Sequence, residues 1–234
     1  MNLSFCILVV AKAPVPGFAK TRLCPPASAL QAADIAAASL LDTLGAVLDT
    51  PGAIPVVAMT GDLANAARGR EISRALREFA VFAQHGRDFA ARLANAHIDT
   101  GTLHPGLPVV QIGMDTPQVT PEILASTREA LLQPDHDAVL GPAEDGGWWA
   151  LGLRDPHHAR ALTDVPMSQT DTGDLTRQAL VDKGLNVGSL ITLSDVDTMA
   201  DAHRVAKLNP LGRFSEAVAA VQQQGSVDQQ GSAA

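Results

Sequence analysis

The order of apolar runs along the chain is the feature that most constrains its fold. Short β-like runs alternate with helical segments, and the runs cover residues 5–11, 54–59, 79–83, 109–113, 138–140, 148–153 and 187–193. Ser28 and Gln31 form the pattern of a capping box before an Ala-rich helix, and Thr120, which precedes a proline, is typical of the start of another. This alternation predicts an α/β fold in which helices cover both faces of a mostly parallel central sheet.

The composition bounds the organisation of the chain and its partners. With 234 residues and 46% hydrophobic content, the chain suits one sizeable domain as well as two small ones, and we expect one domain over residues 1–224. Residues 225–234 read GSVDQQGSAA, which predicts a disordered tail. The net charge of −8 argues against a nucleic-acid partner. The first apolar run is too short to span a bilayer, so we expect a cytoplasmic protein with no membrane partner and two free thiols.

The loop after the first apolar run concentrates positive charge. Residues 11–23 read AKAPVPGFAKTRL and contain Lys12, Lys20 and Arg22, whereas none of the 25 acidic residues of the chain occurs before Asp34. Gly17, within a proline-rich turn, lets backbone amides face a ligand, and phosphate is the ligand that such a loop suits. The alternative is that these cations are ordinary solvated charges. Under either interpretation we expect Lys20 to be an exposed loop cation that contributes little to folding.

Acidic residues follow three later apolar runs. Asp115 lies in QIGMDTPQVTP, Asp145 and Gly146 lie in LGPAEDGGWWALGL, and Asp195 and Asp197 lie in LSDVDTM. Each segment also has a purely structural interpretation. Asp115 would close an Asx-type turn, Asp145 and Gly146 would form a hairpin turn, and the last segment would cap a helix. Aspartates at the ends of adjacent strands would repel each other by about 4 kcal/mol per close pair at an effective dielectric constant near 20. A divalent cation that carries nucleotide phosphates would explain both these carboxylates and the basic loop.

These four segments, in this order, resemble the nucleotide-diphospho-sugar transferase superfamily. They are most similar to its radical-SAM/selenodomain-associated transferase family, and the resemblance covers nearly residues 1–207. The basic loop also resembles that of phospholactate guanylyltransferases, and DVDT resembles the late metal-binding segment of molybdenum-cofactor nucleotidylyltransferases. The resemblance implies a GT-A-like, Rossmann-type three-layer sandwich. Met114, Trp148 and Trp149 depart from the pattern, because a small hydroxyl residue and Tyr or Phe are usual at these places.

The resemblance also implies roles for individual residues. The loop residues that match the nucleotide-phosphate loop are Lys12, Gly17, Lys20 and Arg22. Asp88 and Arg92, in GRDFAARLANA, match the segment that closes over the nucleotide. Asp115 and Asp197 match the ligands of Mg²⁺ or Mn²⁺. We expect Lys20 and Arg22 to act in catalysis as well, and Asp145 and Gly146 to contact the nucleotide.

Three functions are compatible with these residues. We favour nucleotidylyl transfer from a nucleoside triphosphate to a small phosphorylated or hydroxyl acceptor, since the loop suits a triphosphate. Glycosyl transfer from a nucleotide sugar is the second function, and a non-catalytic nucleotide-binding module is the third. The sequence contains no G-x-S-x-G or G-x-G-x-x-G motif and lacks a full Walker A motif, which argues against hydrolase, nicotinamide and P-loop chemistry.

Overall fold

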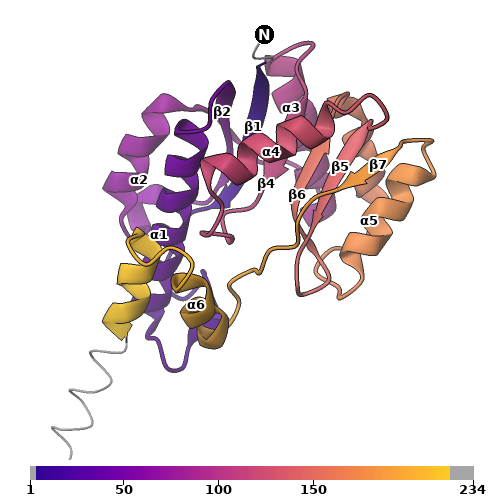
Figure 1. Ribbon diagram of the computed structural model, residues 1–234. Coiled ribbons are helices and arrows are strands. Elements are labelled where there is room, and N and C mark those ends of the chain that lie inside the picture. Colours follow the sequence, from indigo (N-terminus) through magenta and orange to yellow (C-terminus); the bar gives the residue numbers. More distant parts are fainter. Residues whose placement is uncertain (1–3, 222–234) are drawn as a thin grey trace, which may run out of the picture.

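The computed structural model describes residues 4–221 and contains one seven-stranded sheet (Figure 1). The strand order is β3-β2-β1-β4-β6-β5-β7. β6 pairs antiparallel with β4 and β5, and the other pairs are parallel. The strands are β1 (Phe5–Lys12), β2 (Ala53–Thr60), β3 (Ala80–Ala83), β4 (Val109–Ile112), β5 (Ala138–Pro142), β6 (Trp148–Leu153) and β7 (Val187–Ser189).

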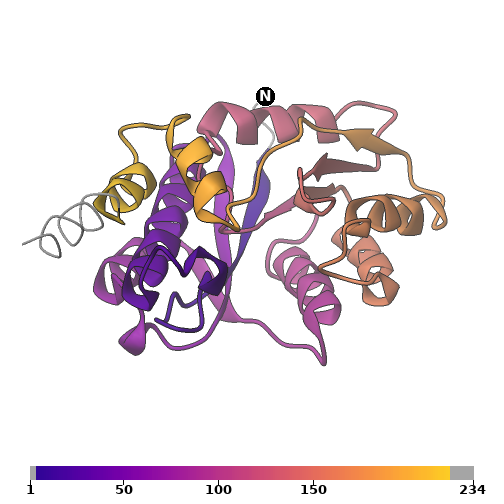
Figure 2. The same cartoon turned by 90° about the horizontal axis from the view of Figure 1, so that it is seen from below.

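Helices cover both faces of the sheet, as Figure 2 shows from below. The α-helices are α1 (Ala29–Leu48), α2 (Gly69–Ala75), α3 (Phe89–Leu103), α4 (Pro121–Leu131), α5 (Thr172–Val181) and α6 (Met199–Ala206). Four 3-10 helices are η1 (Thr21–Leu23), η2 (Leu63–Asn65), η3 (Leu76–Glu78) and η4 (Pro156–Asp164). Residues 213–221 are also helical. The predicted three-layer α/β sandwich with a mostly parallel sheet is confirmed.

The alternation of side chains along each strand separates two cores. Odd-numbered residues of β1, such as Phe5 and Ile7, pack with α1, α2 and α4. Even-numbered residues, such as Cys6 and Leu8, pack with α3, η4 and α5. This double burial explains why β1 reads as a continuous apolar run. Trp149 and Trp148 divide between the two cores in the same way.

α1 is the central helix of one layer. Its predicted capping box is present, with the Ser28 hydroxyl accepting from the Gln31 amide and the Gln31 side chain accepting from the Ser28 amide. One side of α1 packs on the sheet, and the opposite side packs against α6 and residues 214–221. By length and composition α1 would be able to cross a membrane, but 72% of the apolar stretch is buried within the fold. It is therefore the core helix of this layer.

The last predicted strand is shorter than expected. Residues 187–193 form an apolar run, but only Val187–Ser189 pairs along β5. Ile191 is exposed, and its carbonyl accepts a hydrogen bond from the Trp149 indole. Regular pairing ends at Ser189, and an isolated parallel bridge between Leu193 and Ala143 follows before the chain runs on to α6. The predicted tail, residues 225–234, lies outside the described residues.

Candidate functional site

The basic loop after β1 folds back on itself in an unusual backbone conformation. Gly17 has φ of 80°, and Lys20 has φ of 48°, in the left-handed region that non-glycine residues rarely adopt. The Lys12 ammonium donates to the Phe18 carbonyl at 3.0 Å, which closes the loop. Left-handed non-glycine residues persist where their surroundings fix them, often at functional sites.

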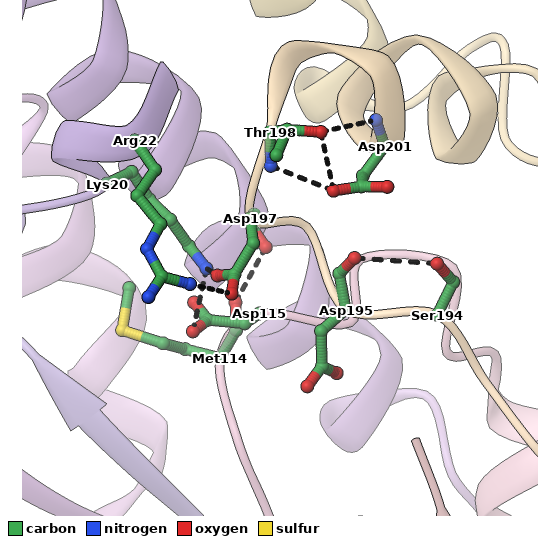
Figure 3. A network of polar contacts seen from close by, with 10 residues as sticks. Lys20, Arg22, Met114, Asp115, Ser194, Asp195, Asp197, Thr198 and Asp201 are labelled. Carbon is green, nitrogen blue, oxygen red and sulfur yellow. Dashed lines mark hydrogen bonds and ion pairs between the residues drawn. The ribbon is translucent and has the colours of Figure 1, made fainter. Parts of the chain in front are cut away.

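The Lys20 side chain is buried between two carboxylates (Figure 3). Its Nζ lies 2.9 Å from Asp115 Oδ2 and 3.3 Å from Asp197 Oδ1, and only 13% of the side chain is exposed. Burial acts to lower the pKa of Lys20, but Asp115 and Asp197 outweigh burial, so its pKa lies above the ordinary value. The prediction of an exposed loop cation is therefore wrong. The cation expected between the aspartates is, in this structure, Lys20 itself.

Arg22 contacts one of the same two carboxylates from the more exposed side. Its Nη1 lies 3.0 Å from Asp197 Oδ2, and 77% of its side chain is exposed. Lys20, Arg22, Asp115 and Asp197 thus form a group of two cations and two carboxylates, which we call the charge cluster.

The segment of residues 190–198, which we call the crossing segment, brings Asp197 to Asp115. It runs from β7 across the strand ends to α6 (Figure 1). The Val196 amide donates to the Asp115 carbonyl at 3.3 Å, and the Gln118 side chain donates to the Ser194 carbonyl at 2.6 Å. Thr198 then caps α6 in a capping box with Asp201.

The expectation that these aspartates end adjacent strands is wrong. β6 and β5 separate β4 from β7 in the sheet. Asp197 reaches Asp115 because hydrogen bonds hold the crossing segment against the loop after β4. The two carboxylates nevertheless lie within contact distance of one ammonium group.

A cavity of about 550 Å³, the main cavity, opens at the strand ends beside the charge cluster. Its walls come from β1, β2, β4, β6, the first turns of α3 and α5, and the crossing segment. A smaller cavity of about 280 Å³, the loop cavity, lies against the basic loop. Lys12, Asp115 and Asp197 line both cavities, whereas Lys20 and Arg22 line the loop cavity.

Some of the other predicted site residues line the main cavity and others do not. Arg92 and Asp145 line the main cavity. Asp88 lines neither cavity; its carboxylate caps α3 by accepting from the Ala91 amide and pairs with Arg87.

The two glycines have conformational roles. Gly17 lines neither cavity and has a positive φ at the tip of the loop. Gly146 also lines neither cavity. Its φ is 90°, and a Cβ there would meet the Thr170 carbonyl oxygen at 1.8 Å. Only glycine permits this close approach between the loop after β5 and the loop before α5.

Sequence reasoning did not include Asp195 among the site residues. Its carboxylate lines the main cavity and points away from Lys20 in Figure 3. Burial and repulsion by Asp145 and Asp115 raise the pKa of Asp195 to about 7. The signal in the sequence was the DVD triplet. Regular strand alternation would place both of its aspartates on one face, but residues 194–197 are not a strand, and only Asp197 contacts Lys20 and Arg22.

The carboxylates suit a magnesium-like ion that carries a phosphate ligand. Asp115 and Asp197 provide hard oxygen ligands at one place. No group of three or more His, Cys, Asp or Glu residues suited to a metal occurs among residues 4–221. Mg²⁺ commonly binds through one or two carboxylates, with water and substrate phosphates as the remaining ligands. The residues present therefore fit a metal that arrives with a nucleotide.

Comparison with solved structures places the fold. A protein named as a "putative nucleotide-diphospho-sugar transferase" from Desulfovibrio desulfuricans G20 matches with a TM-score of 0.79 and 25% identity over 97% of this chain and 98% of that one. A CMP:2-keto-3-deoxy-manno-octonic acid synthetase in complex with CTP matches with a TM-score of 0.54, 10% identity and coverage of 88% and 98%. Rv0371C of Mycobacterium tuberculosis H37Rv in complex with manganese matches with a TM-score of 0.50, 21% identity and coverage of 88% and 100%. The chain therefore has a nucleotide-diphospho-sugar transferase-like fold.

Sequence comparison then gives the family. The chain belongs to DUF2064, described as an uncharacterized protein conserved in bacteria, whose model matches residues 43–169. This match includes Asp115 and Asp145 but neither the basic loop nor Asp197. No curated protein matches the sequence significantly. The finer resemblance to radical-SAM/selenodomain-associated transferases stays a prediction.

Proposed function

We propose that this protein is a divalent-metal-dependent transferase with a nucleotide donor, and that it transfers a nucleotidyl group from a nucleoside triphosphate to a small acceptor. The observation that carries this proposal is the charge cluster. Lys20 and Arg22 from one loop meet Asp115 and Asp197 from two distant segments, and the two aspartates also line the main cavity at the strand ends. Ligands of open α/β sheets bind at this edge. We also propose that residues 1–224 form one domain and that the protein is cytoplasmic.

The proposed roles follow from charge. Asp115 and Asp197 would hold Mg²⁺ or Mn²⁺, which when bound neutralises phosphate charge and polarises phosphoryl oxygens. Lys12, Lys20 and Arg22 would bind the triphosphate, and Lys20 would leave its present carboxylate partners to do so. Arg92, which lines the main cavity, would contact the same nucleotide.

The transfer step is a displacement at phosphorus. An acceptor oxygen attacks the α-phosphorus, the bond from that phosphorus to the bridging oxygen of the β-phosphate breaks, and pyrophosphate leaves. The acceptor proton passes to the solvent. Lys20 and Arg22 stabilise the charge that develops on the α-phosphoryl and pyrophosphate oxygens.

Glycosyl transfer from a nucleotide sugar is the second candidate. The similarity to the Desulfovibrio protein favours it, because that protein is named as a nucleotide-diphospho-sugar transferase and the match covers nearly all of both chains at 25% identity. The same cluster would then stabilise a nucleoside diphosphate leaving group.

Two product assays distinguish these functions. We expect pyrophosphate release from one of four nucleoside triphosphates in the presence of Mg²⁺ and a pool of bacterial small molecules. Release of nucleoside diphosphate from a nucleotide sugar would instead support glycosyl transfer. Isothermal titration with both donor classes tests binding separately. The absence of any donor binding would overturn the proposed function.

The metal site has its own readout. We expect Mn²⁺ to bind tightly only together with a non-hydrolysable nucleoside triphosphate, as seen by electron paramagnetic resonance. Asp197→Asn should weaken this binding at least tenfold. Asp164→Asn, which changes an exposed aspartate that lines neither cavity, is the matched control. Equal Mn²⁺ binding by both variants would contradict the assignment of Asp197.

A further inference from the structure

The lining of the main cavity changes in charge across β4. Lys12, at the end of β1, and Arg92, in α3, come from elements that precede β4 in the chain. β1 neighbours β4 on one side, and β6 neighbours it on the other. The lining residues that follow β4 in the chain come from the loop after β4, the β5–β6 connection, β6, the loop before α5, the start of α5 and the crossing segment. We call the part of the cavity lined by residues 145–195 the acceptor half, whereas Asp115 and Asp197 belong to the charge cluster.

The acceptor half offers no cation to a ligand. Among the cavity-lining residues of the described chain, none that follows β4 is Lys or Arg. Two carboxylates, Asp145 and Asp195, line this half instead. A phosphate group there would meet the Asp145 carboxylate with no cation of this half beside it, and at 4 Å such a pair is repulsive by about 4 kcal/mol at an effective dielectric constant near 20.

The other side chains of this half suit a ring or chain that carries hydroxyl groups. Trp148 is half-buried and lines the cavity, so part of its flat apolar face is available to a ligand. Ser168 and Gln169 line the same half and provide uncharged polar side chains, whereas the Thr172 hydroxyl is used within the loop, where it donates to the Pro166 carbonyl and accepts from the Gln169 amide. Ser168 has φ of 60°, which marks a constrained loop rather than a free one.

The boundary between the halves is also polar and uncharged. Gln111, in β4, lines the cavity and is 1% exposed. Within the described part of the chain, neither the nitrogen nor the oxygen of its carboxamide has a hydrogen-bond partner. Its side chain lies beside the buried His97 ring and acts to raise the pKa of that histidine, so contact with a ligand would require the carboxamide to turn away from His97. A ligand group that both donates and accepts, such as a hydroxyl, would then satisfy the carboxamide.

We propose that the acceptor half binds an uncharged, hydroxyl-bearing acceptor of the sugar or polyol class, and not a phosphorylated one. This inference rests on the proposed function in so far as it calls the ligand an acceptor. The binding preference itself does not require catalysis. It narrows the class of acceptor from phosphorylated or hydroxyl compounds to hydroxyl compounds that carry no phosphate.

The test uses the tryptophan emission of the full-length protein. The chain has two tryptophans, and Trp149 is 2% exposed, so Trp148 is the one that a ligand can contact. Matched pairs are titrated with and without a non-hydrolysable nucleoside triphosphate: ribose and ribose 5-phosphate, glucose and glucose 6-phosphate, glycerol and glycerol 3-phosphate. We expect the uncharged member of at least one pair to bind at least tenfold more tightly than its phosphate.

Three variants control this measurement. Trp148→Phe should remove the emission change. Gln169→Lys adds a cation to an exposed lining position, and it should tighten binding of the phosphorylated members at least tenfold. Gln178→Lys adds the same charge on an exposed part of α5 that does not line the cavity, and it should change nothing.

The outcomes are distinct from those for the proposed function. Tighter binding of the phosphates by the unmodified protein, no emission change with any uncharged compound, or no effect of Gln169→Lys would each overturn the inference. Nucleotide binding by titration calorimetry decides the proposed function separately. Sugar binding without nucleotide binding would preserve the inference about this half and remove the proposed function.

Discussion

At the scale of single residues, Lys20 differs from a surface lysine in both backbone and side chain. Its backbone is left-handed, and its ammonium group is desolvated between Asp115 and Asp197. A desolvated ion is stable only while its partners are present. The residue therefore supports the local structure of the empty site as well as the proposed binding of phosphate.

We predict that Lys20→Met weakens triphosphate binding at least tenfold and also destabilises the protein. Met keeps the length of the stem but leaves two carboxylates without their shared cation. Because both carboxylates are about two-fifths exposed, solvent screens them, and we expect a loss of about 1–2 kcal/mol in the free energy of unfolding. Urea unfolding and titration calorimetry measure the two effects.

A double variant separates the causes. Adding Asp197→Asn to Lys20→Met removes one of the repelling carboxylates, so part of the lost stability should return while nucleotide binding stays weak. Unchanged stability in the single variant would mean that Lys20 is not held as the structure shows.

At the scale of elements, the crossing segment determines whether the site exists. Its two attachments near Asp115 are the Val196 amide and the Gln118 side chain. Gln118 is 6% exposed, so its hydrogen bond to Ser194 is shielded from water. Losing such a bond costs about 1–2 kcal/mol.

We predict that Gln118→Leu raises the dissociation constant of the metal–nucleotide complex about tenfold. The substitution removes the donor to the Ser194 carbonyl, so Asp197 is no longer held at one position relative to Asp115. Hydrogen exchange of residues 190–198 should increase in the same variant. Thr127→Val is the matched control, because it removes a buried side-chain hydrogen bond, to the Leu124 carbonyl, within α4. Normal nucleotide affinity in Gln118→Leu would show that the segment is held by other contacts.

The same elements show which features can be predicted from the sequence and why the others cannot. Local signals identified the capping box of α1, the Thr120 cap of α4 and most of the strand runs, because these depend on neighbours a few residues away. The apolar pattern of residues 187–193 predicts a strand over the whole run. It cannot predict the hydrogen bond from the Trp149 indole to the Ile191 carbonyl, because Trp149 is distant in sequence. The burial of Lys20 depends on a partner 177 positions away, which no local pattern encodes.

At the scale of the whole molecule, both faces of the sheet are covered, and a histidine is enclosed in the core between the sheet and α3. His97, in α3, is fully buried, and neither ring nitrogen has a hydrogen-bond partner within residues 4–221. Burial lowers the pKa of His97 to about 4, and the nearby Gln111 opposes this shift only in part. The folded protein therefore keeps this histidine neutral at pH values where the unfolded chain protonates it.

We predict that acid destabilises the protein through His97. An unfolded histidine has a pKa near 6.5, so the stability that the neutral ring preserves is complete above that pH and is lost as the pH falls toward 4. Linkage gives a loss of about 2 kcal/mol between pH 7 and pH 5 from this residue. Whatever its stability at pH 7, His97→Leu should lose about 2 kcal/mol less over this interval in urea unfolding.

His158→Leu is the matched control for this effect, because His158 is only half-buried. If His97→Leu and the unmodified protein lose the same stability between pH 7 and pH 5, the neutral buried ring is not the source of acid sensitivity.

The position of Asp197 beyond β7 also has a consequence for synthesis on the ribosome. The basic loop and the loop after β4 emerge from the exit tunnel long before the crossing segment does. A nascent chain that ends before residue 190 has Lys20 and Asp115 but not the second carboxylate. The proposed binding of nucleotide at this site therefore has to wait until residues 190–198 have been translated, and chains grow at about 5–20 residues per second. A nucleotide bound as proposed cannot assist the early folding of the sheet through this site.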